Sequence, residues 1–256
     1  MNSLELSILG PAFIAGLLVL STHVPLGTEV LRRGIIFIDL AIAQVAGLGV
    51  IAADWIGWEP SGWQVQLSAI SAALLAAIVL HWTDRRWPEV QEALIGVCFI
   101  MAATAGIILL ANNPHGGENL KELLVGQILW VTYSELIPVA LFSAVILAFW
   151  YVLRDRMRGF GFYALFAFAV TASVQLVGVY LVFASLIVPA LATHNLTHRG
   201  VRLASGYAIG ATGYLVGLIL STYLDLPSGA VIVWSLIGIA IAFGFFCARK
   251  QTGQFQ

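Results

Sequence analysis

The sequence predicts an all-α polytopic integral membrane protein, with about eight or nine transmembrane helices in one transmembrane domain covering residues 1–256. The first observation is composition: 60% of the residues are hydrophobic, 10% are charged and the mean hydropathy is +0.95, more than a water-soluble core accommodates. The second is the recurrence of apolar runs of bilayer length, and the third is that only short polar joints separate them. The net charge of -1 indicates no nucleic-acid partner.

A helix needs about 20 mostly apolar residues to cross the hydrocarbon core of a bilayer. Seven stretches meet this requirement, and they are 7–31, 34–56, 64–82, 90–111, 130–153, 204–223 and 228–248. The N-terminus lacks the positive flank and cleavage site of a signal peptide, so we expect the first stretch to be retained. The two cysteines, Cys98 and Cys247, lie in separate apolar stretches, where we expect them to pack.

The polar joints alternate between basic and non-basic, and this alternation predicts the orientation of the chain. Lysine and arginine accumulate in cytoplasmic loops. Eleven of the twelve such residues lie in the joints at 32–33, 85–86, 154–158, 199–202 and 249–250, and Lys121 is the exception. We therefore expect an N-terminus outside and a C-terminus in the cytoplasm of a multi-pass protein of the cell (inner) membrane. Tryptophans suited to the two interfaces agree: Trp55, Trp58 and Trp63 outside, and Trp82, Trp87 and Trp150 inside.

The stretch at 159–192 lies between two basic joints, so it must cross the membrane an even number of times. Two full helices need more residues, because half of the stretch spans only about 25 Å at 1.5 Å per residue. Either a pair of short helices or a re-entrant hairpin near Gly178 fits. Broken helices at membrane depth occur where protein covers them or where they line a wet cavity. This short broken hairpin therefore indicates a transport pathway.

Asp39 is an acid well inside the second apolar stretch, where a central Asp costs about 2.5–3.5 kcal/mol. Because intramembrane acids usually face a cavity or a partner, we interpret Asp39 as lining a transport path. Its hard oxygen atoms suit a divalent cation in transit. The alternative is an ion pair with Arg32 or Arg33 near the inner interface.

Two other polar residues lie in the first two apolar stretches. Gln44 points about 140° away from Asp39 on a regular helix, so either the helix is broken near residues 47–49 or Gln44 bonds to a neighbouring helix. His23 lies two residues before Pro25. Its imidazole is either a ligand suited to zinc or a donor to the backbone carbonyl that the proline leaves unpaired.

For three other candidates, a role outside the transport path is favoured. Glu29 is a weaker path residue, because the arginines at 32–33 lie three and four residues later and favour a local ion pair. His194 and His198 share one face of a helix, a spacing that can bind zinc. They lack a third ligand, and Asn195 replaces the glutamate of an HExxH motif, so contact with a partner protein or solvent is favoured.

Three residues belong to the outer half. His115, in the loop NNPHGGENLKE, either touches an incoming ion or its carrier protein or belongs to a solvated connection. Asp225 begins DLPSG, which we interpret as a structural turn into the last helix, with a docking face as the second interpretation. Gln175 lies just before the break at Gly178 and is a minor path candidate.

Five segments, in order, resemble the integral membrane permeases of ABC importers for zinc, manganese and iron. They are LGTEVLRRGIIFID (26–39), EALIGVCFIMAATAGIIL (92–109), HGGENLKELLVGQILWVTYSEL (115–136), VGVYLVFASLIVPALATHNL (177–196) and YLDLPSGAVIV (223–233). Most members place a histidine four residues after the acid that corresponds to Asp39, whereas this chain has Ala43. The inner joint at 154–158 is also shorter than the family pattern, and its usual acidic portion is missing.

The resemblance implies two permease copies around a central path, each bound to a cytoplasmic ABC ATPase. By resemblance, a coupling segment at about 189–202 begins a helix at Pro189 and runs through THNLTHR, with His194, Asn195, His198 and Arg199 as ATPase contacts. An extracytoplasmic metal-binding protein would dock at the outer face near His115 and Asp225. The charge-based topology independently places the coupling segment inside.

We therefore expect a permease subunit that moves a divalent metal ion into the cytoplasm, zinc first, with manganese or iron as alternatives. No catalytic residue and no covalently bound cofactor is expected; the metal is the cargo. The chain has no G-x-x-x-x-G-K-[ST] phosphate loop, so ATP hydrolysis belongs to a separate subunit. An ion-coupled secondary transporter is the alternative class, and it predicts an inverted repeat that we do not find. An intramembrane metalloprotease needs an H-E-x-x-H motif in a span, and the sequence has none.

Overall fold

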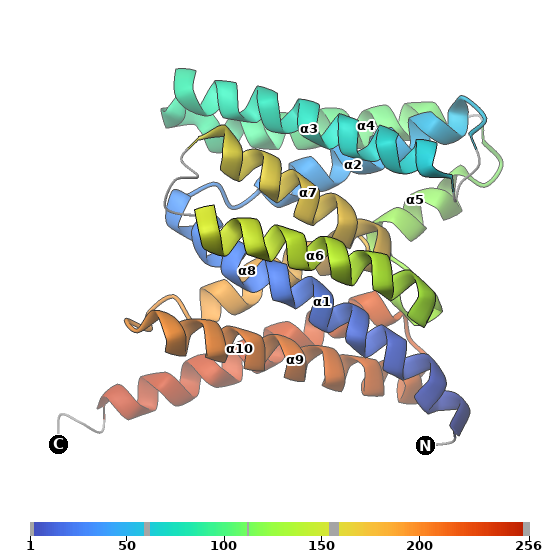
Figure 1. The fold of residues 1–256 in the computed structure, drawn as a ribbon. Coiled ribbons are helices and arrows are strands. Elements are labelled where there is room, and N and C mark those ends of the chain that lie inside the picture. Colours follow the sequence, from blue (N-terminus) through green and yellow to red (C-terminus); the bar gives the residue numbers. More distant parts are fainter. Residues whose placement is uncertain (1–2, 59–61, 112, 154–158, 253–256) are drawn as a thin grey trace.

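The computed structural model describes residues 3–58, 62–111, 113–153 and 159–252, and within these ranges every regular element is helical (Figure 1). The α-helices are α1 (Ser3–Arg33), α2 (Ile38–Trp55), α3 (Trp63–Arg86), α4 (Gln91–Leu110), α5 (Gly116–Val125), α6 (Tyr133–Leu153), α7 (Phe160–Val177), α8 (Val179–Ala192), α9 (Arg199–Leu224) and α10 (Ser228–Thr252). Two short 3-10 helices, η1 (Pro88–Val90) and η2 (Ile128–Trp130), precede α4 and α6.

The predicted fold class is confirmed. Eight of the described helices are long and apolar enough to cross a membrane, and α8 is a shorter apolar helix. Each of the seven predicted apolar stretches forms one helix whose ends lie within a few residues of the expected limits. α1 stays helical through Pro11 and Pro25 and ends with Arg32 and Arg33 in its last turn.

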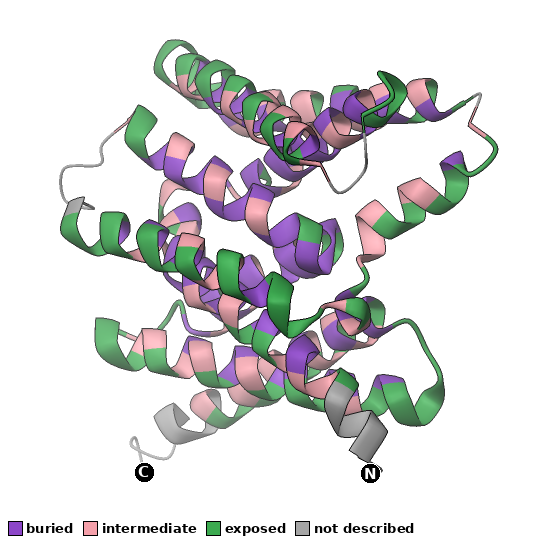
Figure 2. Ribbon diagram, turned by 45° about the vertical axis from the view of Figure 1, so that its right-hand side comes forward, coloured by how far each residue is buried: buried purple, intermediate pink, exposed green. Residues whose placement is uncertain are grey.

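α2 occupies a central position in the bundle. It packs against α3 and α4 on one side and against α7 and α8 on the other, while α1 packs against α8, α9 and α6. α3 and α4 form one edge of the molecule, and α9 and α10 form the opposite edge (Figure 1). Buried residues concentrate on the helices between these edges, and the outer faces of α4, α6 and α10 are largely exposed and apolar, as contact with lipid requires (Figure 2).

The described basic joints lie at one end of the bundle, as their alternation predicts; these are 32–33, 85–86 and 199–202. The α1–α2, α3–α4 and α8–α9 connections are at the left of Figure 1, and the N-terminus and the α2–α3 and α9–α10 connections are at the right. The basic joint at 154–158 lies outside the described residues, as do the side chains at 249–250. The charge pattern predicts the cytoplasm at the left end, which we therefore call the inner end, and we call the right end the outer end.

The stretch at 159–192 folds as two helices that turn at Gly178. At 1.5 Å per residue, the 18 residues of α7 give about 27 Å and the 14 residues of α8 about 21 Å. α7 therefore reaches the length of a span, whereas α8 does not. Gly178 has φ 79° and ψ 164°, a backbone conformation that is essentially restricted to glycine.

The turn at Gly178 is packed backbone to backbone against the end of α5. A Cβ atom at Gly178 would overlap the backbone of Val125 and Gly126, and one at Gly126 would overlap that of Val177 and Gly178. At the start of α10, a Cβ atom at Gly229 would overlap the Val125 carbonyl oxygen. Three glycines from separate segments therefore allow α5, the hairpin and α10 to meet.

Helix α5 corrects the sequence-based expectation of a polar joint at 112–122. Leu120, Leu123 and Leu124 are half-buried, while Glu118, Lys121 and Glu122 are exposed. This three-and-four spacing makes an amphipathic helix whose Leu123 packs on Gly47 in the middle of α2. The expectation was wrong because residues 112–119 are polar or glycine-rich, and the leucines that form the apolar face come only at the end of this stretch and after it.

The predicted coupling segment is not one continuous helix. Pro189 lies inside α8, which ends at Ala192, and residues 193–198 form a turn and an irregular stretch before α9. Thr193 Oγ1 donates to the Pro189 carbonyl at 2.7 Å, and His194 Nδ1 lies 2.7 Å from the Leu191 carbonyl. These side chains hydrogen-bond the last carbonyls of the helix and end it.

Candidate functional site

Asp39 lies in the first turn of α2 and is 0% exposed. Both of its carboxylate oxygens are buried and form no hydrogen bond among the described residues. A buried carboxylate without a partner is costly, and such groups in native structures call for an explanation such as an ion or water. The side chain therefore has the properties expected of a residue that receives a cation.

The ion pair considered as an alternative for Asp39 is not formed. Arg32 and Arg33 both bond to Glu29: Arg32 Nε lies 2.9 Å from Oε2, and Arg33 Nε lies 2.7 Å from Oε1. The arginines are therefore engaged within the last turns of α1, which confirms the structural interpretation of Glu29. Two guanidinium groups neutralise Glu29, so it has little capacity left for a cation.

His23 lies in the middle of α1 and is fully buried. Its Nδ1 atom is 2.9 Å from the Val19 carbonyl oxygen. Because a carbonyl oxygen only accepts, Nδ1 of the neutral ring carries the proton and Nε2 keeps its lone pair. Nε2 is buried without a hydrogen-bond partner among the described residues. His23 thus presents an unpaired nitrogen of the kind that binds zinc.

The competing role of His23 is filled by another residue. Pro25 has no N–H, so the Ser21 carbonyl, four residues earlier, lacks its helical donor. The Tyr207 hydroxyl of α9 donates to that carbonyl at 3.0 Å. The backbone is thus satisfied without His23. Nothing in the sequence pattern identified Tyr207, because the contact joins residues 186 positions apart.

Gln44 is buried on a continuous α2, so the alternative of a break near residues 47–49 does not hold. No hydrogen bond of its amide to a neighbouring helix is found in the described parts of the chain. Ala43, at the position where the family pattern has histidine, is also buried and supplies no ligand atom. One turn of α2 therefore carries the Asp39 carboxylate without a second ionisable group.

No group of three His, Cys, Asp or Glu side chains that could hold a metal is found in ranges 3–58, 62–111, 113–153 and 159–252. Asp39 and His23 each supply ligand atoms, but neither belongs to a closed cage.

At the inner end, the predicted ATPase contacts are exposed but do not share a helical face. His194, Asn195 and His198 are all exposed, and His198 immediately precedes α9, which starts at Arg199. The prediction that His194 and His198 align on one helix is wrong, because the chain is irregular between them. The segment presents exposed polar side chains at this end of the bundle.

At the outer end, the three predicted residues lie in separate places. His115 is exposed at the start of α5, with Nδ1 3.2 Å from a Glu118 carboxylate oxygen. Asp225 is exposed and ends α9 with φ 54° and ψ 45°, which supports its interpretation as a structural turn. Gln175 is exposed and accepts a 2.5 Å hydrogen bond from Gln66 of α3, so its amide ties α7 to α3.

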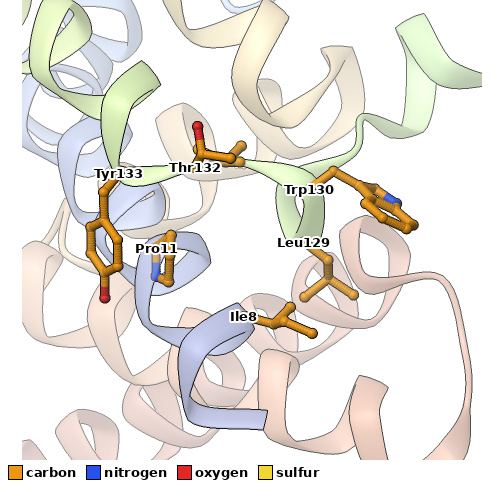
Figure 3. A pocket seen from close by; sticks show the side chains of 7 residues that line it. Ile8, Pro11, Leu129, Trp130, Thr132 and Tyr133 are labelled. Atoms are coloured by element: carbon orange, nitrogen blue, oxygen red, sulfur yellow. The ribbon is translucent and has the colours of Figure 1, made fainter. Parts of the chain in front are cut away.

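Near the outer end there is also a pocket of about 240 Å³ between the start of α1 and the η2–α6 connection (Figure 3). Its lining includes Ile8, Pro11, Leu129 and Trp130. It is mostly apolar and lies at the opposite end of the bundle from Asp39, so it takes no part in the candidate site.

Sequence reasoning missed one acidic residue that lies close to the start of α2. Glu92, in the first turn of α4, accepts a 3.1 Å hydrogen bond at Oε1 from the backbone N–H of Phe37, the residue before α2. Its Oε2 atom is buried and unpaired among the described residues. An acid at the edge of an apolar stretch was the available signal, but its contact with residue 37 spans 55 positions.

The chain is similar to several characterised membrane proteins. It is 26% identical to the manganese transport system membrane protein MntC of Halalkalibacterium halodurans, over 97% of this chain and 90% of that protein. It is 24% identical to the high-affinity zinc uptake system membrane protein ZnuB of Haemophilus influenzae, over 88% and 92%. It is 30% identical to the chelated iron transport system membrane protein YfeC of Yersinia pestis, over 70% and 66%.

The fold is that of PsaBC from Streptococcus pneumoniae, solved in complex with Fab, with a TM-score of 0.75 at 20% identity over 92% of this chain and 90% of that chain. The model of the ABC 3 transport family matches residues 5–162 and 153–247, nearly the whole sequence. The chain therefore belongs to the ABC 3 transport family, and this confirms its resemblance to metal ABC permeases.

Proposed function

We propose that this chain is the permease subunit of an ATP-driven importer of a divalent metal ion. The observation that carries the proposal is Asp39, a fully buried carboxylate with both oxygens unpaired on the central helix of a transport-family fold. A divalent cation compensates such a group by supplying the missing positive charge. His23, with its unpaired Nε2, is the second ligand-bearing residue on the proposed path.

Zinc is the proposed cargo, with manganese and iron as the alternatives. A carboxylate oxygen and a neutral imidazole nitrogen are both good ligands for zinc. The relatives carry names that include manganese, zinc and iron transport, so all three ions belong in the test. Mn²⁺ and Fe²⁺ accept the same two ligand types, with a preference that follows geometry and availability.

The proposed complex contains a cytoplasmic ABC ATPase, an extracytoplasmic metal-binding protein and a second copy of the permease. The exposed polar residues of the stretch before α9, His194, Asn195 and His198, and the start of α9 would contact the ATPase, since they lie at the basic end of the bundle. The outer end, including His115 and Asp225, would receive the metal-binding protein. In this arrangement the protein lies in the inner membrane, with its N-terminus outside and its C-terminus in the cytoplasm.

The test is reconstitution of the chain in liposomes with a candidate ABC ATPase and a candidate metal-binding protein from the same organism. ATP hydrolysis and metal accumulation are measured for Zn²⁺, Mn²⁺ and Fe²⁺ separately. We expect Zn²⁺, delivered by the binding protein, to stimulate hydrolysis and to accumulate on the side away from that protein. Stimulation by Mn²⁺ or Fe²⁺ alone would reassign the cargo.

The same liposomes distinguish an ABC importer from an ion-coupled secondary transporter. A secondary transporter would accumulate metal without ATP when a proton or sodium gradient is imposed, and it would not co-purify with an ATPase. Accumulation that follows the gradient and ignores ATP would overturn the importer proposal. If none of the three ions stimulates ATP hydrolysis, the assignment of a divalent metal as the cargo is wrong.

A further inference from the structure

The carboxylate of Glu92 lies at the beginning of the helix that carries Asp39. Its Oε1 atom is bonded to the Phe37 N–H at 3.1 Å, and Asp39 follows Phe37 by two residues in the chain. α4 also packs along α2. The hydrogen bond therefore fixes one acid at the inner end of α2, while Asp39 points into the core from the first turn of the same helix.

Asp39 and Glu92 together have three carboxylate oxygens that are buried without a hydrogen-bond partner among the described residues. They are Oδ1 and Oδ2 of Asp39 and Oε2 of Glu92. Capping α2 requires one oxygen of Glu92 and leaves the second without a role. A helix N-terminus stabilises negative charge through its free N–H groups. A divalent cation would use the unpaired oxygens.

The charge of the inner end makes such an acid useful to a departing cation. Arg32, Arg33, Arg85 and Arg86 lie at this end of the bundle. A single guanidinium about 10 Å away repels a divalent ion by about 3 kcal/mol at an effective dielectric constant of about 20. Glu29 engages Arg32 and Arg33, and a further carboxylate on the path lowers the remaining barrier.

We propose that Glu92 is the exit carboxylate of the transport path, which receives the divalent cation after Asp39 and before the inner side. The inference rests on the proposed metal transport. In the present structure one oxygen of Glu92 is held by the Phe37 N–H and the other is unpaired. Glu92 thus joins two tasks, because it caps the start of α2 and offers an oxygen ligand beside it.

The test compares Glu92→Gln with Glu92→Ala in the complete reconstituted complex. Glutamine keeps a carbonyl oxygen for the Phe37 N–H and nearly the same volume, but it removes the charge. We expect Glu92→Gln to lower the maximal rate of metal uptake at least tenfold. The half-saturating metal concentration and the thermal unfolding midpoint should stay near those of the unchanged protein. Glu92→Asp should restore part of the rate.

The matched control is Glu89→Gln, which removes an exposed acid in η1, three residues away at the same end of the bundle. It should transport at the unchanged rate. Wild-type uptake by Glu92→Gln would overturn the inference, and so would a loss confined to Glu92→Ala, which would leave Glu92 a helix cap only.

Failure of the inference and failure of the proposed function are distinguishable by Asp39→Asn. If Asp39→Asn is inactive and Glu92→Gln is active, the path through Asp39 stands and the exit carboxylate does not. If Asp39→Asn transports normally, the path itself is misplaced, and the inference about Glu92 is overturned with it.

Discussion

The Tyr207 hydroxyl donates a 3.0 Å hydrogen bond to the Ser21 carbonyl, the acceptor that Pro25 leaves without its helical donor. This bond ties α9 to α1 two residues from His23. It shows that the carbonyl freed by Pro25 is satisfied by a distant helix rather than by a local side chain. His23 is not needed for this role, and its Nε2 has no hydrogen-bond partner among the described residues.

Removing the Tyr207 hydroxyl should destabilise the bundle. Tyr207→Phe leaves the Ser21 carbonyl unpaired, and we expect a loss of about 1 kcal/mol in the free energy of unfolding, the usual size of an interhelical hydrogen bond in membranes. The measurement is thermal unfolding in detergent. Tyr223→Phe, which changes an exposed tyrosine on the same helix, is the control.

A second substitution tests the cause of this loss. Pro25→Ala restores a backbone N–H four residues after Ser21, so Tyr207→Phe should cost less in the Pro25→Ala background than in the unchanged chain. An equal cost in both backgrounds would show that the Tyr207 hydroxyl acts on something other than the carbonyl freed by Pro25.

Asp39→Asn should abolish metal uptake while leaving the protein folded. The amide keeps the shape of the side chain but removes a buried unpaired charge, so we expect an unfolding midpoint equal to or above that of the unchanged chain. Uptake into liposomes and thermal unfolding are the two measurements. Asp54→Asn, at the exposed outer end of the same helix, is the control and should transport normally. Normal uptake by Asp39→Asn would make the carboxylate incidental.

Gly178→Ala should prevent correct folding. The residue has φ 79°, and a Cβ atom would overlap the backbone at Val125 and Gly126, so the strain of about 1–3 kcal/mol from the dihedral angles is added to a steric clash. The yield of monodisperse protein after size exclusion reports the effect. Gly117→Ala is the control, because a Cβ atom there meets nothing within 4 Å. A normal yield of Gly178→Ala would refute the backbone contact.

The orientation is tested by labelling single cysteines in intact cells with a membrane-impermeant maleimide. Cys98 and Cys247 are replaced by alanine so that only the introduced thiol reacts. His198→Cys should react only after the cells are opened, and Asp225→Cys should react in intact cells. Both positions are exposed and lie at opposite ends of the bundle. The reverse pattern would invert the proposed topology.

The sequence identified the spans and the break at Gly178 because length, hydropathy and charge alternation act locally along the chain. α5 was missed because its polar first half hid the spacing of Leu120, Leu123 and Leu124. The helix predicted from Pro189 through 193–198 failed because Thr193 and His194 bond to the preceding carbonyls. Resemblance to the family does not predict such side-chain hydrogen bonds.

The site was predictable only in part for a different reason. Asp39 was identifiable because a single acid in an apolar stretch is energetically costly, and its burial agrees with a place inside the bundle. The ion pairs of Arg32 and Arg33 with Glu29 were predictable, because they lie three and four residues apart on one helix. The bond from the Phe37 N–H to Glu92 was not, because it spans 55 positions and depends on how α4 packs against α2.

The glycine contacts at the tip of the hairpin limit how this chain can vary. Gly126, Gly178 and Gly229 each face main-chain atoms of another segment rather than a side chain that could shrink in compensation. A library of random variants selected for growth on scarce metal should thus retain all three glycines together, while the apolar residues around them drift.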